Sequence, residues 1–230
     1  MAHTYDLAEF KEKFDLLRAQ GFVRSQRGGP TGIGHTLEQM LGMKENNIAV
    51  PDLCKVELKS RRITSGSMTT LFTFDRKVWK IKYLTAINDY GTPDKDGRMG
   101  LYYTMSAKPN SRGLFLCIEP ETISVRHIHG LTVAEWQLEQ LAARFMQKIP
   151  ASVVVSALVD RRDGREWFHY TRAQLRYGTS ASIFREQISV GNVMVDLRLH
   201  ALPTRARNHG TGFRIHENKL THLFKEVEEL

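Results

Sequence analysis

The chain has 230 residues, 41% of them hydrophobic, with a formal charge of +8 at pH 7 and an isoelectric point near 9.6. This length and composition allow one well-buried core and exclude an intrinsically disordered chain. No apolar run approaches the roughly 20 residues of a membrane span, and the acidic residues near the N-terminus argue against a signal peptide, so we expect a soluble, cytoplasmic protein. The excess of positive charge is typical of proteins that bind polyanions such as nucleic acids.

Hydrophobic spacing and turn residues predict helices and strands along the whole chain. In chain order we expect a helix over residues 6–20, a short helix through 37–41, strands over 51–62 and 67–74, a helix over 76–89, strands over 101–107, 113–119 and 122–128, a helix over 132–149, strands over 152–159 and 166–171, a helix over 180–190, strands over 193–200 and 213–215, and a closing helix over 218–230. This mixed order favours an α/β or α+β fold in which a mixed β-sheet is flanked by helices.

Local signals mark several of these boundaries. Thr132 and Glu135 have the spacing of a capping box before a helix. Asp163 followed by Gly164 predicts a tight hairpin between two strands. The loop at residues 27–34 is rich in glycine but lacks the lysine of a phosphate-binding loop, which excludes a nucleotide site of that kind.

Arginine is concentrated in the second half of the chain. From Arg161 to Arg214 there are ten arginines, no lysine and four acidic residues. The planar guanidinium can hold a phosphate or a guanine edge through two hydrogen bonds at once, whereas lysine acts as a point charge. This half is therefore predicted to read a nucleic acid, the alternative being a solvated basic surface with scattered ion pairs.

One predicted strand carries residues suited to hydrolysis. Side chains two apart on a strand share a face, so Glu57 and Lys59 point one way while Val56 and Leu58 face the core. Asp52 lies in the turn before this strand and can meet the other two polar side chains. Two carboxylates bind Mg²⁺, which prefers oxygen ligands and activates water, and a neighbouring ammonium stabilises charge on a phosphate. The three residues predict phosphodiester hydrolysis, the alternative being an exposed strand face with an ordinary Glu and Lys.

Four separated blocks make the sequence resemble a known family. They are TGIGHTLE from Thr31, the Pro51–Asp52 pair with Val56-Glu57-Leu58-Lys59, TLFT from Thr70, and HGTGFRI from His209, all in this order. The pattern resembles the MvaI/BcnI group of type II restriction endonucleases, members of the PD-(D/E)xK superfamily whose fold is similar to the mismatch-repair nickase MutH. The resemblance covers nearly the whole chain, although residues 92–150 carry no motif that aligns.

The resemblance implies a restriction-endonuclease-like core with a metal-dependent catalytic set. Asp52 and Glu57 are implied as metal ligands, Lys59 as a catalytic lysine, and Glu38 on the preceding helix as a supporting acid. Glu38 could instead be an ordinary solvent-facing carboxylate or salt-bridge partner. The implied cofactor is Mg²⁺, with Mn²⁺ as a substitute, and the glycine-rich loop at Thr31 would let the backbone approach DNA closely.

The domain organisation expected from the resemblance is a single domain over residues 1–230. Its two lobes would form a DNA cleft, with a catalytic lobe over 1–150, a DNA-recognition lobe over 151–215 and a C-terminal helix over 216–230.

Base reading is expected in the later half of the chain. In the strand at 193–200 the polar residues Asp196, Arg198 and His200 alternate with apolar ones. Because Arg can hold guanine O6 and N7 while Asp accepts from cytosine N4, this face suits a G·C-rich target, unless it is a plain amphipathic strand.

The resemblance to the family suggests further candidate DNA contacts in and beside the matching blocks. His209 and Arg214 are expected to contact the groove, Arg205 and Arg207 the phosphates, and Asp75 and Arg76 the minor groove.

The family pattern implies a monomer with one active site that cuts double-stranded DNA at a short pseudopalindromic sequence. Such an enzyme would nick one strand and then the other, leaving 5′-phosphates, and would work beside a cognate DNA methyltransferase. Two alternatives stay open: a mismatch-repair nickase that depends on a partner ATPase, and a catalytically silent DNA-binding module.

Overall fold

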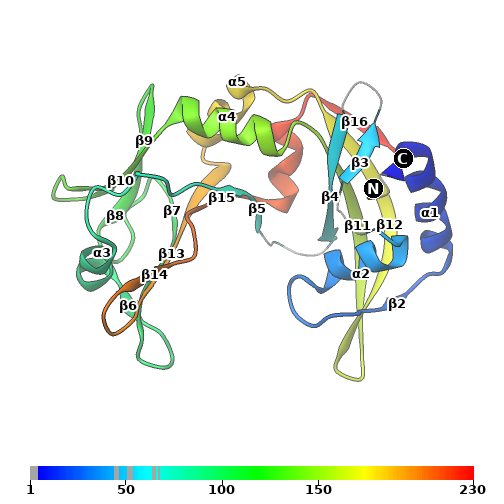
Figure 1. Cartoon of the computed structure of the whole chain (residues 1–230), viewed down its shortest axis with the longest axis horizontal. Helices are drawn as coiled ribbons and strands as arrows, with labels where there is room; N and C mark the ends of the chain where they lie inside the picture. The colour runs from blue at the N-terminus through cyan, green and yellow to red at the C-terminus, as the bar shows by residue number, and fades with distance from the viewer. Residues whose placement is uncertain (1–4, 44–46, 51–53, 64–65, 67) are drawn as a thin grey trace. The chain divides into compact units, whose positions relative to one another are not determined.

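The computed structural model describes residues 5–43, 47–50, 54–63, 66 and 68–230. The chain forms two compact units: unit 1 is Met1–Ser67, Ile149–Thr179 and Thr221–Leu230, and unit 2 is Met68–Lys148 and Ser180–Leu220 (Figure 1). The units therefore interleave along the sequence and do not follow contiguous lobes at 1–150 and 151–215. Strands from the second half of the chain complete the sheet of unit 1.

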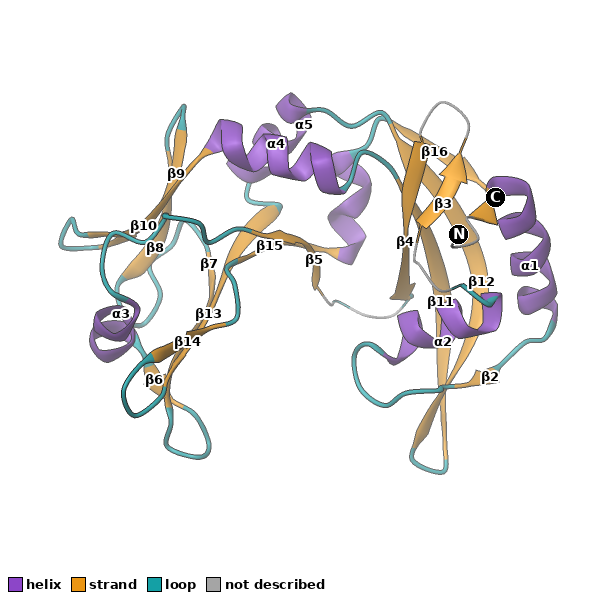
Figure 2. Ribbon diagram, in the orientation of Figure 1, coloured by secondary structure: helices purple, strands orange, loops and turns teal. Residues whose placement is uncertain are grey.

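Unit 1 is a mixed sheet of seven strands, within the described residues, packed against two helices (Figure 2). The strand order is β1-β3-β4-β11-β12-β16, and β2 pairs with β12. The elements are β1 (Tyr5–Asp6), α1 (Leu7–Ala19), β2 (Val23–Arg24), α2 (Gly32–Leu41), β3 (Asn47–Val50), β4 (Cys54–Arg62), β11 (Ser152–Arg162), β12 (Arg165–Tyr177) and β16 (Glu226–Glu229). β1 runs parallel to β3 and β4 parallel to β11, while the other pairs are antiparallel.

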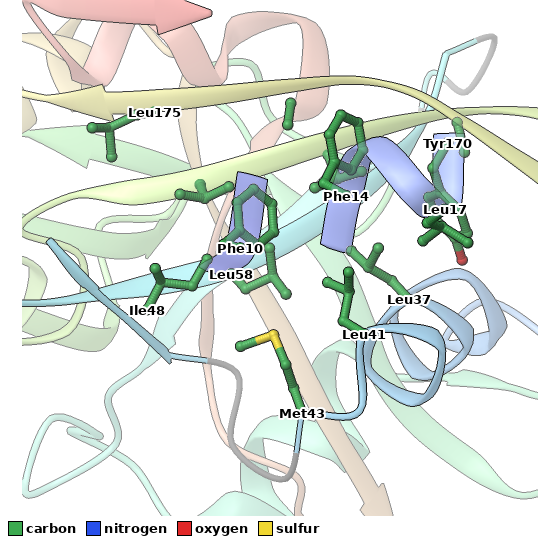
Figure 3. Packing of buried hydrophobic residues seen from close by; sticks show 14 of the residues in the cluster. Phe10, Phe14, Leu17, Leu37, Leu41, Met43, Ile48, Leu58, Tyr170 and Leu175 are labelled. Carbon is green, nitrogen blue, oxygen red and sulfur yellow. The ribbon is translucent and has the colours of Figure 1, made fainter. Parts of the chain in front are cut away.

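The core of unit 1 forms where both helices face the sheet. Phe10, Phe14 and Leu17 recur at helical spacing on α1 and are buried, and Leu37 on α2 and Leu58 on β4 pack into the same cluster (Figure 3). Burying an aromatic side chain of this kind stabilises a fold by several kcal/mol, on the order of 3–5 for Phe against Ala. The predicted helix at 6–20 is confirmed, and the Asp6 side chain caps it by accepting from the Glu9 N–H at 2.8 Å.

The hairpin of β11 and β12 confirms another prediction. Asp163 and Gly164 both have positive φ angles, 50° and 73°, and Arg162 pairs with Arg165 across the turn. This is the geometry that the right-handed twist of paired strands favours and that an Asp-Gly sequence adopts readily.

Unit 2 contains two antiparallel sheets and three α-helices, within the described residues. One sheet has the order β5-β15-β13-β7-β6 with β14 on β13, and the other β10-β9-β8. The elements are β5 (Met68–Thr73), α3 (Tyr83–Tyr90), β6 (Thr92–Pro93), β7 (Met99–Met105), β8 (Leu114–Ile118), β9 (Thr122–His127), β10 (Thr132–Gln137), α4 (Leu138–Lys148), α5 (Ala181–Ser189), β13 (Val193–Ala201), β14 (Ala206–Asn208) and β15 (Gly212–His216). None of the described helices is long and apolar enough to cross a membrane.

Aromatic side chains fill the core of unit 2. Phe72 stacks on Phe213 with ring centroids 4.9 Å apart, and Phe145 of α4 stacks on Phe184 of α5 at 4.6 Å. Trp136 is buried beside Phe213 and donates its indole N–H to the Phe74 carbonyl at 2.9 Å, so its polar atom is satisfied.

Two of the predicted helices begin later than expected, and both for the same reason. Residues 132–137 are strand β10, and only Leu138–Lys148 is helical, so Thr132 and Glu135 are not a helix cap. The segment 76–82 is not helical either, since the Lys80 N–H donates to Val133 O and the Glu135 N–H to Val78 O, both at 2.9 Å. The backbone groups that a helix would have used are engaged in pairing between these two segments.

The predicted C-terminal helix is also wrong. Residues Glu217–Leu223 form a 3₁₀ helix and Glu226–Glu229 the edge strand β16, which pairs with β12. The exposed edge of β12 offers backbone partners that an isolated terminal helix lacks, and Leu230 N–H also donates to Ala173 O at 3.0 Å.

Removing the Tyr170 hydroxyl should weaken the contact between β12 and α2. This buried hydroxyl donates to the Ile33 carbonyl at 2.7 Å, and burial raises the pKa of Tyr170, so the group stays a donor. We expect Tyr170→Phe to lower the free energy of unfolding by about 1 kcal/mol in urea denaturation. Tyr177→Phe is the control, because the structure gives its hydroxyl no partner among the described residues; equal losses in both variants would contradict the assignment.

Candidate functional site

Strand β4 presents its polar residues on one face of the sheet of unit 1. Val56 and Leu58 are buried in the core, while the side chains of Glu57 and Lys59 are 25% and 18% exposed. Lys59 Nζ lies 2.9 Å from Glu57 Oε1. The predicted alternation is confirmed, and the two residues form a close ion pair beside solvent.

A buried guanidinium lies in the same row of this face. The parallel register places Glu57 beside Ser152, and the antiparallel register of β11 and β12 places Ser152 beside Arg176. Arg176 is 1% exposed, and its Nε and Nη1 atoms have no hydrogen-bond partner in the described part of the chain. Burial, and next the charge of Arg61, lower the pKa of Arg176 to about 10, so it remains cationic at neutral pH.

Arg176 adds an electrostatic feature that the sequence reading missed. Two strand spacings separate it from Glu57, roughly 10 Å. A cation that is this strongly desolvated acts at longer range than a surface charge, because water screens it less. No local signal in the sequence marks this burial, because Arg176 shares the polar register of β12 with Arg172 and Gln174.

The other two predicted catalytic residues are Asp52 and Glu38, and the part of the chain that the structure describes shows neither of them in contact with the Glu57–Lys59 pair. Asp52 lies outside the described residues. Glu38 is half-buried on α2, which packs on the core-facing side of β4, and its carboxylate has no hydrogen bond or ion pair among the described residues. No group of three or more His, Cys, Asp or Glu side chains gathers at one point within the described residues.

Thr31 lies at the start of α2, where it is exposed. Its side chain makes no capping hydrogen bond. Thr31 is therefore exposed, whereas Gly32 and Ile33 of the first turn are buried.

A second polar face lies on the larger sheet of unit 2. Val195, Leu197 and Leu199 are fully buried, while the alternate residues of β13 lie on the opposite face. These are Asp196, Arg198 and His200, and by register and contact their neighbours on this face are Tyr102 and Thr104 of β7 and Arg214 of β15.

Asp196 and Arg214 are engaged with each other. Arg214 Nη1 donates to Asp196 Oδ2 at 2.9 Å, and its Nη2 donates to Met68 O at 2.8 Å. Thr104 Oγ1 donates to the other carboxylate oxygen at 3.0 Å, and Asp196 is 7% exposed. In this arrangement both side chains brace the sheet face. Arg198 has greater freedom: its Nε donates to Gly210 O at 3.3 Å, and its two terminal nitrogens make no hydrogen bond among the described residues.

His200 is held inside a small cluster. Its Nδ1 lies 2.9 Å from the Tyr102 hydroxyl and 3.1 Å from His209 Nε2. Burial, followed by the charge of Arg98, lowers the pKa of His200. A neutral ring that accepts at Nδ1 keeps a proton on Nε2, so the cluster can present a hydrogen-bond donor.

Asp75 fastens the loop that leads into β15. Its carboxylate accepts from the Thr211 N–H at 2.5 Å, the Thr211 hydroxyl at 2.6 Å and the Trp79 indole at 3.0 Å. Both carboxylate oxygens are thus used inside unit 2, which makes Asp75 a support for the loop containing His209. Its neighbour Arg76 is exposed and borders a groove of about 1210 Å³ between residues 73–80 and α4.

The remaining predicted contacts are exposed side chains around β14. Arg205, Arg207 and His209 all face solvent, and the two arginines form no ion pair within the described residues. Arg205 also borders a cavity of about 590 Å³ lined by Trp79 and Tyr83. The structure thus brings His200 and His209 together and leaves both arginines free for a phosphate.

Comparisons of the sequence and of the structure with known proteins point to one family. The model of the MvaI/BcnI restriction endonuclease family matches residues 11–224. Among solved structures, the complex of restriction endonuclease MvaI with its cognate DNA substrate matches with a TM-score of 0.74 at 25% identity, over 97% of each chain. MvaI in the absence of DNA matches with a TM-score of 0.55 at 24% identity, over 100% of this chain and 99% of that one. No curated protein matches.

The titration of His200 can be measured directly. Its folded-state pKa is lowered, so its contribution to stability is fully present above the ordinary value of 6.5 and is lost as the pH falls through the lower folded value. We expect its ring signals in ¹H–¹⁵N NMR to titrate below 6.5, and Arg98→Ala to move the midpoint upward. A midpoint at or above 6.5 that does not respond to Arg98→Ala would contradict this environment.

Proposed function

Because the chain belongs to the MvaI/BcnI restriction endonuclease family, it is a site-specific DNA endonuclease, and we propose that it hydrolyses double-stranded DNA with Mg²⁺ through Asp52, Glu57 and Lys59. The observation that carries the proposal is the ion pair of Glu57 and Lys59 on the open face of β4. A neighbour of similar fold was solved with its cognate DNA, which supports duplex DNA as the substrate.

The donor chemistry at Glu57 suits a hard cation. One carboxylate oxygen accepts from Lys59, and the other has no hydrogen-bond partner among the described residues. Mg²⁺ needs only one or two protein carboxylates, because water and substrate phosphate complete its shell, and Mn²⁺ can occupy similar oxygen sites. Glu57 and Asp52 would hold the ion, and the chemistry that it supplies when bound is the activation of water.

Lys59 would act on the reacting phosphate and its nucleophile. Its ammonium, oriented by Glu57, can position the attacking water and offset the negative charge that develops as the bond to phosphorus forms. Arg176 adds a fixed positive charge from the same face without reaching the reacting atoms. We assign Glu38 a supporting role through the α2 helix that packs on β4.

The polar face of β13 would read the sequence. Arg198, with free terminal nitrogens, would hold guanine, while Asp196 and Arg214 support that face and His200 with His209 supplies a further hydrogen-bonding group. Arg205, Arg207 and Thr31 would contact the phosphate backbone, and Arg76 the minor groove. The target would be a short G·C-rich pseudopalindrome.

The enzyme would act as a monomer that cuts the two strands in turn. One catalytic set on one strand of one sheet cannot reach two antiparallel phosphodiesters at once. The host would need a cognate methyltransferase that protects the same sequence, acting on the DNA without binding this chain.

Replacing Lys59 tests the catalytic assignment. We expect Lys59→Ala and Glu57→Gln each to lower the rate of DNA cleavage in Mg²⁺ by at least about 100-fold, while site-specific binding measured in Ca²⁺ remains. Lys11→Ala on α1 is the control and should cleave at the wild-type rate. Cleavage by Lys59→Ala at the rate of that control would refute the assignment.

A supercoiled plasmid with one target site tests the order of cutting. We expect an open-circle intermediate before the linear form at every enzyme concentration, with a first-order rate at saturation. Linear product without a nicked intermediate, formed faster as protein dimerises, would show that the monomer proposal is wrong. Accumulation of nicked circles that are never linearised would instead indicate a nickase.

A further inference from the structure

A basic groove lies at an edge of unit 1, away from the Glu57–Lys59 pair. It has a volume of about 850 Å³ and is bounded by residues 25–30, the end of β4 and the tip of the β11–β12 hairpin. Its charged lining consists of Arg27, Arg62, Arg161, Arg165 and Glu166.

One of these arginines builds the groove. Arg62 donates to Glu166 Oε2 at 2.7 Å and to Pro30 O at 3.1 Å, and its guanidinium lies 5.5 Å from the centre of the Phe168 ring. It therefore ties the loop at 25–30 to the hairpin and neutralises the only acidic side chain among the lining residues.

The other lining arginines have almost no internal partner. Arg27 and Arg165 are exposed and form no hydrogen bond or ion pair through their side chains within the described residues. The Arg161 side chain is 81% exposed, and its ion pair with Glu166 is long, at 3.9 Å. Gly28 and Gly29 add backbone N–H groups that no described residue accepts from, with nothing within 4 Å of where a Cβ would stand. Guanidinium groups and open backbone N–H groups around one hollow are the donors that bind phosphate.

The groove lies within a duplex's reach of the catalytic strand. Arg62 is on β4, five residues after Glu57, which corresponds to roughly 16 Å in an extended strand. This odd spacing turns its side chain to the core-facing side of the sheet, so a duplex that contacts both must pass the end of β4. At about 3.4 Å per base pair, the distance along the strand is about five steps along a duplex. A backbone held in the groove would belong to DNA beside the cleaved bond and not to the bond itself.

We propose that this groove is a clamp for the phosphate backbone of duplex DNA outside the recognition sequence, with Arg27, Arg161 and Arg165 as its phosphate ligands. The inference rests on the proposed DNA cleavage. It adds a contact that raises affinity for any sequence and leaves base selection to the face of β13.

The double variant Arg27→Ala/Arg165→Ala tests the clamp by fluorescence anisotropy in Ca²⁺. Dissociation constants for target and non-target duplexes should rise by similar factors, and the slope of log affinity against log salt should fall by about two. The cleavage rate at saturating DNA should be unchanged. The defect should shrink on a duplex that ends at the recognition sequence, because no flanking phosphate then reaches the groove.

Two further variants separate the clamp from bulk charge and from misfolding. Lys11→Ala/Arg18→Ala removes the same formal charge from α1 of the same unit and should leave affinity and slope near wild type. Asp163→Asn, which keeps a residue tolerant of its positive φ and removes an acid from the hairpin tip, should tighten binding to both duplexes.

Three outcomes decide the matter. Equal affinities and slopes for the groove and α1 double variants would overturn the clamp while leaving cleavage intact, as would a loss confined to the target duplex. If the wild-type protein cleaves no DNA in Mg²⁺, the proposed function itself fails, whatever the variants do.

Discussion

The parallel pairing of β4 with β11 is the constraint on which the proposed catalytic face depends. Side chains alternate along a strand, so this pairing buries Val56 and Leu58 against the helices and commits Glu57 and Lys59 to the opposite face. A slip of one residue would exchange the two pairs, burying charge and exposing the core. The hydrophobic residues of β4 therefore specify the orientation of its polar ones, and stability and chemistry are coupled through one register.

Each polar face contains a buried charged residue. Arg176 is buried inside unit 1, and Asp196 is buried inside unit 2, where it accepts from Arg214. A buried charge costs several kcal/mol in desolvation, on the order of what a stable domain can spare. Such groups rarely increase stability. They hold the polar atoms of the face in place before substrate arrives, so that less ordering is needed on binding.

The sequence was most informative where a pattern is local. The period of α1, the Asp163–Gly164 turn and the alternation of β4 and β13 each depend on neighbours a few residues apart, and the structure has all of them. The first six residues of the helix expected at 132–149, and the whole helix expected at 216–230, are not α-helical because their residues pair with other segments of the chain. Contacts between side chains follow the same rule. The contact of Glu57 with Lys59 could be predicted from their spacing on one strand, whereas Asp75 is bound by Thr211 and Arg214 by Met68, which lie far away in the sequence.

Arginine composition alone could not assign roles because this chain uses the residue in two opposite ways. A guanidinium whose nitrogens are already bonded, as in Arg62, shapes the protein and has little left for a ligand. One whose terminal nitrogens are free, as in Arg198 or Arg165, loses less on meeting a phosphate or a base, because those nitrogens have no internal hydrogen bond to break first. The distribution of internal acids therefore determines which arginines can bind DNA, and Glu166 and Asp196 make that selection in the two units.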